Sequence, residues 1–302
     1  MGRSAFGHAP NDGYCHSPAM SMKPAAYKKV IGFLSIAVLF LLLTNYLALR
    51  KLDLVTRGPA SGEDVKKEIV SKPESKIKPK KRVGTIVLVI DDFGYRNDQV
   101  SDGFLDLGIP ITCAIIPGHA QSREFAQKAK AAGQEVIIHM PMESTVRESG
   151  EENYKIKTGM ISEEIEWRIR EVFKEMPEAV GMNNHQGSKA TMNGKVMSVV
   201  GSVLKQEGKY FVDSRTSSAT VGEKTMRSLG VPTMRRHIFL DNESDKKKIA
   251  NQLEQLVKMA GKQGIALGIG HARPNTLAVL KKEIPDLLAK GFQFEFASQN
   301  VK

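Results

Sequence analysis

Six apolar runs in this sequence end abruptly in an aspartate or a histidine. The residues at their ends are Asp91 with Asp92, His139, His185, Asp213, Asp241 and His271. Apolar runs of this length are typical of buried parallel strands. Barrels and open α/β sheets gather their catalytic groups at the carboxyl ends of such strands. We therefore expect these side chains to meet on one face of one domain, in an active site that contains a metal ion.

The adjacent carboxylates of Asp91 and Asp92 are the most specific feature of this set. Two neighbouring carboxylates repel each other, and a buried strand end accommodates them poorly unless a cation lies nearby. Successive side chains of an extended backbone point in opposite directions, so we expect one carboxylate to bind a metal and the other to handle a proton. Aspartate is also a favoured helix N-cap, and a cap at Asp92 or Asn97 is the alternative.

His139 and His185 each follow an apolar run. Neutral imidazole is the commonest nitrogen ligand for zinc and similar ions. A single histidine at a strand end is usually structural, but these two with Asp92 form a set of two histidines and one carboxylate. Such a set leaves coordination positions open for water and substrate. The sequence therefore predicts a divalent metal, zinc or a similar ion, at these three residues.

Four other residues could support this chemistry. His271, in the glycine-rich stretch GIGHARPNT, is a candidate general acid because an imidazole titrates near neutral pH. Asp213 and Asp241 could orient His271 or a metal-bound histidine. Arg215 could keep the catalytic carboxylate ionised, as a nearby cation does. An ion-pair network on the surface is the alternative for the two aspartates and the arginine.

Several further side chains carry weaker signals. Glu143, in the stretch HMPME, could line the cleft, whereas His237 begins an apolar run and is expected to be structural. Trp167, in the amphipathic segment EEIEWRIREVF, is expected to pack on a helix face and not to form a platform for a sugar ring. Cys113 is expected in the core. With only Cys15 besides it, the chain has no disulfide framework and no cysteine-based zinc site.

Strand-like runs alternate with segments of helical spacing from Gly84 to the C-terminus. The strand candidates are 84–90, 111–116, 135–139, 179–183, 210–213, 237–240, 265–270 and 292–297. The helix candidates are 121–132, 162–175, 194–207, 246–263 and 275–289, with Pro274 near the start of the last. Such alternation indicates βαβ units and a parallel sheet. Seven or eight units predict a (β/α) barrel over residues 84–302. The alternative is an open doubly wound sheet, although no G-x-G-x-x-G motif follows the first strand.

The net charge of +11 is concentrated in the N-terminal part of the chain. Residues 1–83 carry 15 Lys and Arg against 6 Asp and Glu, a balance of +9, which leaves +2 for residues 84–302. A globular part that is nearly neutral argues against nucleic-acid binding, for which a basic face is the usual sign. Residues 50–83 are rich in Lys, Glu, Ser and Pro, a composition that predicts a disordered, charged linker.

Residues 30–49, VIGFLSIAVLFLLLTNYLAL, contain no charged side chain. At about 1.5 Å per residue this run is long enough to cross the hydrocarbon core of a bilayer. No clean Ala-x-Ala cleavage site follows, which favours a retained transmembrane anchor over a cleaved signal. Residues 1–29 would then form a disordered cytoplasmic head. By default for a single N-terminal anchor, the domain after it would lie outside the cytoplasm, attached to the membrane.

Taken together, the motifs resemble a known family. The stretches VIDDFG, AIIPGH, HMPME, GMNNHQGS, YFVDSRT, FLDN and GHARPNT run in order across residues 84–302. They resemble the divergent polysaccharide deacetylase family, a distant relative of the carbohydrate esterase family four deacetylases. The resemblance implies a (β/α) barrel, a divalent metal that is usually zinc-like, and removal of N-acetyl groups from a polysaccharide such as peptidoglycan or a chitin-like glycan.

The resemblance also implies roles for single residues. Asp92, His139 and His185 resemble the metal-binding triad of the family. Asp91 resembles the base that activates the attacking water, and His271 resembles the acid that protonates the leaving amine. The better-known esterases place both histidines in one H-x-x-x-H motif, whereas here the two lie far apart in the sequence, so the site is assembled differently.

Two other functions stay open at this level. The first is a non-catalytic module of the cell envelope that binds a glycan or acts as a scaffold and keeps the barrel. The second is glycoside hydrolysis, which needs two carboxylates that flank the bond; Glu143, Asp213 or Asp241 could then join Asp91. The complete set of acids and histidines at the strand ends favours the deacetylase.

Overall fold

The computed structural model describes residues 34, 37–46, 82–146 and 150–302. The chain divides into two units, residues 1–75 and 76–302. In the first unit, residues 37–46 are helical and most of their apolar side chains are exposed. Within the ranges that the structure describes, no helix combines the length and the apolar character that crossing a bilayer requires. The predicted head, both ends of the predicted anchor and nearly all of the predicted linker lie outside these ranges.

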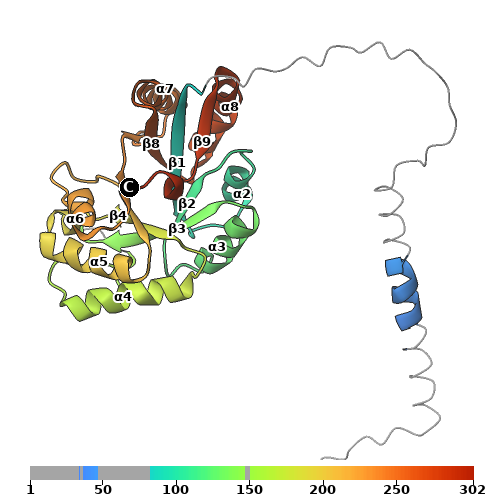
Figure 1. The fold of residues 1–302 in the computed structure, drawn as a ribbon, viewed down its shortest axis with the longest axis horizontal. Helices are drawn as coiled ribbons and strands as arrows, with labels where there is room; N and C mark the ends of the chain where they lie inside the picture. The colour runs from blue at the N-terminus through green and yellow to red at the C-terminus, as the bar shows by residue number, and fades with distance from the viewer. Residues whose placement is uncertain (1–33, 35–36, 47–81, 147–149) are drawn as a thin grey trace, which may run out of the picture. The chain divides into compact units, whose positions relative to one another are not determined.

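In the second unit, a parallel sheet of nine strands curls on itself and helices surround it (Figure 1). The strands are β1 (Gly84–Phe93), β2 (Thr112–Ile115), β3 (Glu135–Met142), β4 (Gly181–Gln186), β5 (Tyr210–Asp213), β6 (Thr233–Arg235), β7 (Ile238–Phe239), β8 (Ile265–His271) and β9 (Phe292–Glu295). The helices are α2 (Gln99–Leu105), α3 (Ser122–Ala131), α4 (Ser162–Glu175), α5 (Gly194–Gln206), α6 (Gly222–Leu229), α7 (Lys246–Gln263) and α8 (Pro274–Lys290).

The strand order distinguishes between the two predicted architectures. The order is β6-β5-β4-β3-β2-β1-β8-β7, with β9 paired to β1. Read around a ring, this order is sequential, whereas a doubly wound sheet reverses direction at a switch point. The doubly wound alternative is therefore wrong. Only Arg236 and His237 separate the edge strands β6 and β7 along the chain, and no ladder of the described residues joins them. The curled sheet fits a (β/α) barrel that is open between β6 and β7.

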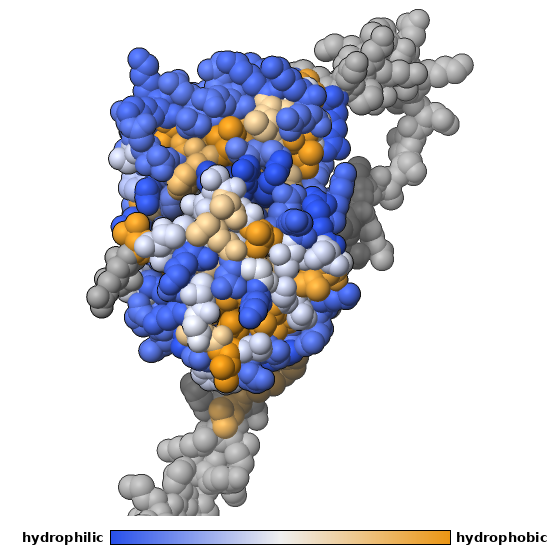
Figure 2. Space-filling model, turned by 90° about the vertical axis from the view of Figure 1, so that its left-hand side faces the viewer, coloured by the Kyte–Doolittle hydropathy of each residue, from blue (hydrophilic) through white to orange (hydrophobic). Residues whose placement is uncertain are grey.

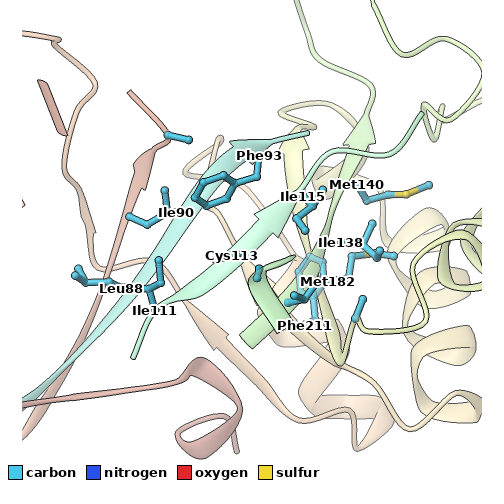
Figure 3. Close-up of a cluster of buried hydrophobic side chains, with 14 of the residues drawn as sticks. Leu88, Ile90, Phe93, Ile111, Cys113, Ile115, Ile138, Met140, Met182 and Phe211 are labelled. Carbon is cyan, nitrogen blue, oxygen red and sulfur yellow. The ribbon is translucent and has the colours of Figure 1, made fainter. Parts of the chain in front are cut away.

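Two apolar clusters lie on opposite faces of the curled sheet. Leu88 and Ile90 of β1 belong to the larger cluster, which includes buried side chains of the surrounding helices. Figure 3 shows part of this cluster with Cys113, which is buried as predicted. Val87 and Val89 belong to a smaller cluster formed almost entirely by strand residues. Because side chains alternate along a strand, the odd-numbered positions of β1 face the interior of the curled sheet.

The same alternation brings residues of several strands to the interior at their carboxyl ends. In β3 and β8, the residues two positions before His139 and His271 belong to the interior cluster. The register of the sheet pairs Asp91 with His271 and His139 with Asn183. The strand ends are therefore level, and side chains of four different segments converge at one rim of the sheet.

Most predicted elements are confirmed. Helices α4 and α7 coincide with the predicted segments, and α8 begins at Pro274, where a proline fits the first helical position. The sequence patterns do not predict α2, α6 and β6, because elements this short contain too few residues to show a period.

The surface of the second unit has a mixed character. The face shown in Figure 2 is mainly polar, and its apolar residues gather in separate patches. Because helices cover the outer face of the sheet, its large apolar cluster lies beneath them and away from solvent.

Candidate metal centre

The backbone of Asp92 determines how the two adjacent carboxylates lie. Its φ of 66° is left-handed, which is uncommon for a residue other than glycine. This turn breaks the alternation of the strand, so Asp91 and Asp92 both approach His139. Asp91 Oδ2 lies 3.6 Å and Asp92 Oδ1 lies 3.5 Å from His139 Nε2. The expectation that the two side chains point in opposite directions is therefore wrong.

Asp92, His139 and His185 form a compact group of possible metal ligands. One ligand atom from each lies within 4.8 Å of the others. His139 Nε2 is 3.0 Å from His185 Nδ1. His185 Nδ1 is in turn 3.4 Å from Asp92 Oδ1. The Oδ1 atom is buried and has no hydrogen-bond partner of acceptable geometry. Such an atom is costly to bury, and together with two imidazole nitrogens it fits a zinc-like divalent cation.

Asn183 fixes the orientation of two members of the site. Its Nδ2 donates to Asp91 Oδ1 at 2.8 Å, so its amide oxygen faces His139 Nδ1 at 2.7 Å. An amide oxygen only accepts hydrogen bonds, and His139 Nδ1 must therefore carry the proton. The lone pair of the neutral ring then lies on Nε2, which faces Asp92 and His185. No motif of the sequence predicts this role for Asn183, although Asn183 lies two positions before His185 and so shares its face of β4.

The charges of the site indicate that it attracts a cation. Burial raises the pKa of Asp91 above its usual range. Burial also acts to raise the pKa of Asp92, but the nearby imidazoles of His139 and His185 outweigh it and lower that pKa. Burial acts to lower the pKa of His139, yet the carboxylates of Asp91 and Asp92 raise it to about 9. Two carboxylates thus draw positive charge to one small, buried position.

His271 and Asp241 form a second, adjoining pair. Asp241, fully buried, accepts from His271 Nδ1 at 2.8 Å through Oδ1. Its Oδ2 accepts from the His271 backbone N–H at 2.8 Å and from the Thr276 hydroxyl at 2.6 Å. Burial acts to lower the pKa of His271, but the hydrogen bond to Asp241 outweighs it and raises that pKa. His271 Nε2 remains directed at the site, 3.8 Å from Asp92 Oδ2.

The structure does not bring Asp213 to this site. On β5, Phe211 belongs to the helix-facing cluster, and Asp213 shares its side of the strand. The Asp213 carboxylate accepts from the Arg215 backbone N–H at 2.9 Å, the Thr220 hydroxyl at 2.9 Å and the Glu223 backbone N–H at 3.0 Å. It therefore anchors the loop before α6 and the first turn of that helix, and the catalytic role predicted for it has no support from the geometry.

The arginine that lines the cavity of the site is Arg236 and not the predicted Arg215. Arg236 lines the same cavity as Asp91, and Arg215 does not. Arg236 Nε donates to the Ser214 carbonyl at 2.6 Å, and Arg236 Nη2 donates to the Arg215 carbonyl at 2.9 Å. The Arg236 guanidinium lies 4.5 Å from the Phe239 ring centroid. Burial lowers the pKa of Arg236, and the Asp91 carboxylate opposes that shift. Sequence reasoning missed Arg236 because nothing there shows that the link from β6 to β7 crosses the site.

The site opens into a small cavity of about 140 Å³. Its walls are formed by Asp91, His139, Asn184, His185, Gln186, Ser214, Thr216, Arg236, Phe239, Ile269 and His271. Cavities that enclose a whole drug-sized ligand measure about 300–1,000 Å³. This cavity therefore suits one small group of a larger molecule. The curled parallel sheet and the two-histidine, one-carboxylate site define a barrel-like α/β protein with a candidate metal centre at the carboxyl rim.

Comparison with known proteins identifies the family. Residues 88–301 match the family model described as divergent polysaccharide deacetylase, and the chain belongs to that family. It is 36% identical over 204 residues to the uncharacterized protein YibQ of Escherichia coli K12, across 68% of this chain and 63% of that protein. It is 34% identical over 202 residues to an uncharacterized protein of Haemophilus influenzae Rd, across 67% of this chain and 71% of that protein.

A solved structure shows the same fold. An uncharacterized protein of Agrobacterium tumefaciens C58 superposes with a TM-score of 0.66 at 17% identity, across 72% of this chain and 89% of that chain. At this identity the likeness concerns the fold alone. The barrel-like fold and the family that the sequence motifs predict are thus confirmed, while the roles of the site residues stay predictions.

Proposed function

We propose that the protein is a metal-dependent hydrolase that removes N-acetyl groups from a cell-envelope polysaccharide, cleaving a carbon–nitrogen bond that is not a peptide bond. The observation that carries the proposal is Asp92 Oδ1, a buried carboxylate oxygen without a hydrogen-bond partner, beside nitrogens of His139 and His185. Membership of the divergent polysaccharide deacetylase family supports the reaction and the polysaccharide substrate.

Three ligand atoms would hold the metal: Asp92 Oδ1, His139 Nε2 and His185 Nδ1. When bound, a zinc-like ion lowers the pKa of water toward neutrality and polarises the acetamide carbonyl. Asn183 prepares His139 for this role, because it keeps the proton on Nδ1.

The chain's own side chains would move the protons. Asp91 would accept the proton of the attacking water through Oδ2, since Asn183 already donates to Oδ1. His271 would donate a proton from Nε2 to the departing amine, and Asp241 would hold the opposite ring nitrogen. The water oxygen bonds to the carbonyl carbon, the carbon–nitrogen bond breaks, and acetate and a free sugar amine leave. Arg236 would stabilise the ionised form of Asp91.

The size of the cavity agrees with this substrate class. About 140 Å³ admits an acetamide group and its immediate surroundings, while the rest of a polysaccharide stays outside. Phe239 and Ile269 supply an apolar wall against which an acetyl methyl group could lie.

We also propose that the enzyme acts outside the cytoplasm, attached to the membrane by residues 30–49. The uncharged run of these residues supports this location. The exposed apolar side chains of the helical residues 37–46 also support it. Peptidoglycan or a chitin-like glycan would then be within reach of the domain.

The test is to purify the full chain in detergent, measure bound metal by mass spectrometry and follow acetate release from peptidoglycan and from N-acetylglucosamine oligomers. We expect bound zinc or a similar ion and acetate release that stops on chelation. The variant His139→Ala should lose both, and Asp213→Asn, outside the site, should retain the metal. Bound metal without acetate release from any glycan would contradict the proposal and favour a non-catalytic glycan-binding module.

A further inference from the structure

We propose that the glycan chain extends from the metal centre across residues 151–157 to Trp167, so that the protein binds several consecutive sugars and not a single amino sugar. This inference rests on the proposed function, because it takes the substrate of the metal centre to be a glycan. It assigns a binding surface to aromatic side chains that the metal centre does not use.

The first observation is a series of cavities that share wall residues. The cavity at the metal centre shares Gln186 with a larger cavity of about 670 Å³. Glu152 lines both that cavity and one of about 210 Å³. Asn153 and Tyr154 line both the latter and a cavity of about 400 Å³, whose wall includes Trp167. Each cavity of this series, from the metal centre to α4, thus shares at least one wall residue with the next.

Trp167 is the distal end of this path and the single tryptophan of the chain. It is 60% exposed, so the prediction that it packs on a helix face is wrong. The buried face of α4 is formed by Ile165, Ile169, Val172 and Phe173, and Trp167 lies on the other side of the helix. A tryptophan in this position forgoes much of the free energy that burial of its ring would contribute, and an exposed aromatic beside a cavity is typical of a binding surface.

A second aromatic face lies closer to the metal centre. Tyr95, three residues after Asp92, is 47% exposed, and its ring centroid is 4.2 Å from that of His119. Glu151 holds both, since it accepts from the Tyr95 hydroxyl at 2.9 Å and lies 3.1 Å from His119 Nε2. His119 and Glu151 line the cavity of about 210 Å³. Apolar faces with polar edges therefore occur at two places along the path, an arrangement that suits the faces and hydroxyls of sugar rings.

The charges along the path favour a polyhydroxylated chain of low net charge. The large cavity contains three lysines and two glutamates, of which Lys189 pairs with Glu143 at 2.7 Å and Lys157 pairs with Glu152 at 2.6 Å. A strongly anionic polymer such as a nucleic acid would require a larger excess of positive charge than one lysine. Paired charges instead offer donors and acceptors side by side, and hydroxyl groups can exchange hydrogen bonds with both.

Because Trp167 is the single tryptophan, its fluorescence reports directly on the distal end of the path. The full chain in detergent, with its metal removed to prevent turnover, is titrated with the dimer and the hexamer of N-acetylglucosamine, and calorimetry measures binding in parallel. We expect the hexamer to change the Trp167 emission and the dimer to leave it unchanged. Trp167→Ala should weaken hexamer binding about tenfold, as the loss of one aromatic contact does, and dimer binding should stay the same.

Two variants control for indirect effects. Trp167→Phe keeps an aromatic ring and should retain most of the affinity for the hexamer. Leu288→Ala removes a comparably exposed apolar side chain of α8, 45% exposed, and should change neither affinity. Melting curves establish that each variant is folded.

The outcomes separate this inference from the proposed function. Hexamer binding that leaves the emission unchanged and tolerates Trp167→Ala would overturn the glycan path, even where the metal-loaded protein releases acetate. A tryptophan response to the hexamer without acetate release from the metal-loaded protein would support the path and contradict the deacetylase. Absence of hexamer binding would overturn the glycan path, whereas only absence of acetate release from the metal-loaded protein would contradict the deacetylase.

Discussion

His139 Nε2 lies 3.0 Å from His185 Nδ1, although 46 positions separate the two residues in the sequence. Their rings meet edge to face, with centroids 4.7 Å apart. Two imidazoles in this position must share a proton or a cation, and the unpartnered Oδ1 of Asp92 adds a negative charge to the same point. The register of β3 and β4 produces this contact, because it places Pro141 opposite His185 and His139 two residues earlier on the same face.

Metal binding should stabilise the fold as well as supply chemistry. A ligand that binds the folded chain alone stabilises it by about 2.7 kcal/mol when present at a hundred times its Kd. We therefore expect chelation to lower the melting temperature and added zinc to restore it. His185→Ala should abolish the response to zinc, while Asp213→Asn should preserve it. Calorimetric melts with and without a chelator measure the effect, and an unchanged response in His185→Ala would exclude this residue as a ligand.

Asn183 should act as a positioning residue for Asp91 and His139. Asn183→Leu leaves two buried polar groups without partners, at a cost of about 1–3 kcal/mol each. We expect zinc affinity and acetate release to fall by about tenfold to a hundredfold, as they do when a partner of a metal ligand is removed. Zinc titration of this variant measures the loss of metal affinity separately from the loss of acetate release. Asn184→Ala changes the neighbouring amide and should retain more zinc affinity, since Asn184 bonds to the Ser214 backbone and not to His139.

Replacing the two arginines should have different consequences. Arg236→Gln removes the cation that shares a cavity with Asp91, and we expect acetate release to fall by about tenfold or more at neutral pH. Arg215→Gln should change the rate much less, because the Arg215 side chain does not line that cavity. Initial rates of acetate release from the same glycan provide the comparison. Equal losses of rate in both variants would show that Arg236 does not specifically stabilise the ionised form of Asp91.

Asp241 should determine where the activity declines at alkaline pH. His271 must be protonated to act as an acid, and the hydrogen bond to Asp241 raises its pKa by stabilising the charged ring. Activity should therefore be present below that pKa and be lost as pH rises through it. Asp241→Asn removes the negative charge, so the alkaline limb of the rate profile should move to lower pH. An alkaline limb that does not move in Asp241→Asn would show that the titration of a group other than His271 causes the decline.

Asp213 should contribute to stability and not to the reaction. Asp213→Ala leaves the N–H groups of Arg215 and Glu223 without their acceptor and removes a partner of the Thr220 hydroxyl. Loss of such a helix-start acceptor costs about 0.5–2 kcal/mol. We expect a lower free energy of unfolding in urea with near-normal acetate release from the folded fraction. A large loss of activity at unchanged stability would restore Asp213 to the site.

Much of the site could be predicted because its residues end apolar runs. A parallel sheet brings the carboxyl ends of its strands together, so the sequence alone predicts that His139, His185 and His271 meet. The same reasoning also placed Asp213 at the site, whereas in the structure its carboxylate binds the loop before α6. All four residues of β5 are buried, and a strand buried on both faces does not show in its sequence which face meets the helices.

The sequence by itself determined the order of most strands and helices, the family and the residue types at the strand ends, because these depend on local periodicity and short motifs. The tertiary structure alone decided four further features. These are the left-handed turn that brings Asp92 beside Asp91, the bridge made by Asn183, the approach of Arg236 and the exposure of Trp167. None of these features leaves a periodic trace in a single sequence, and the contacts of Asn183 and Arg236 join segments that are distant in the chain.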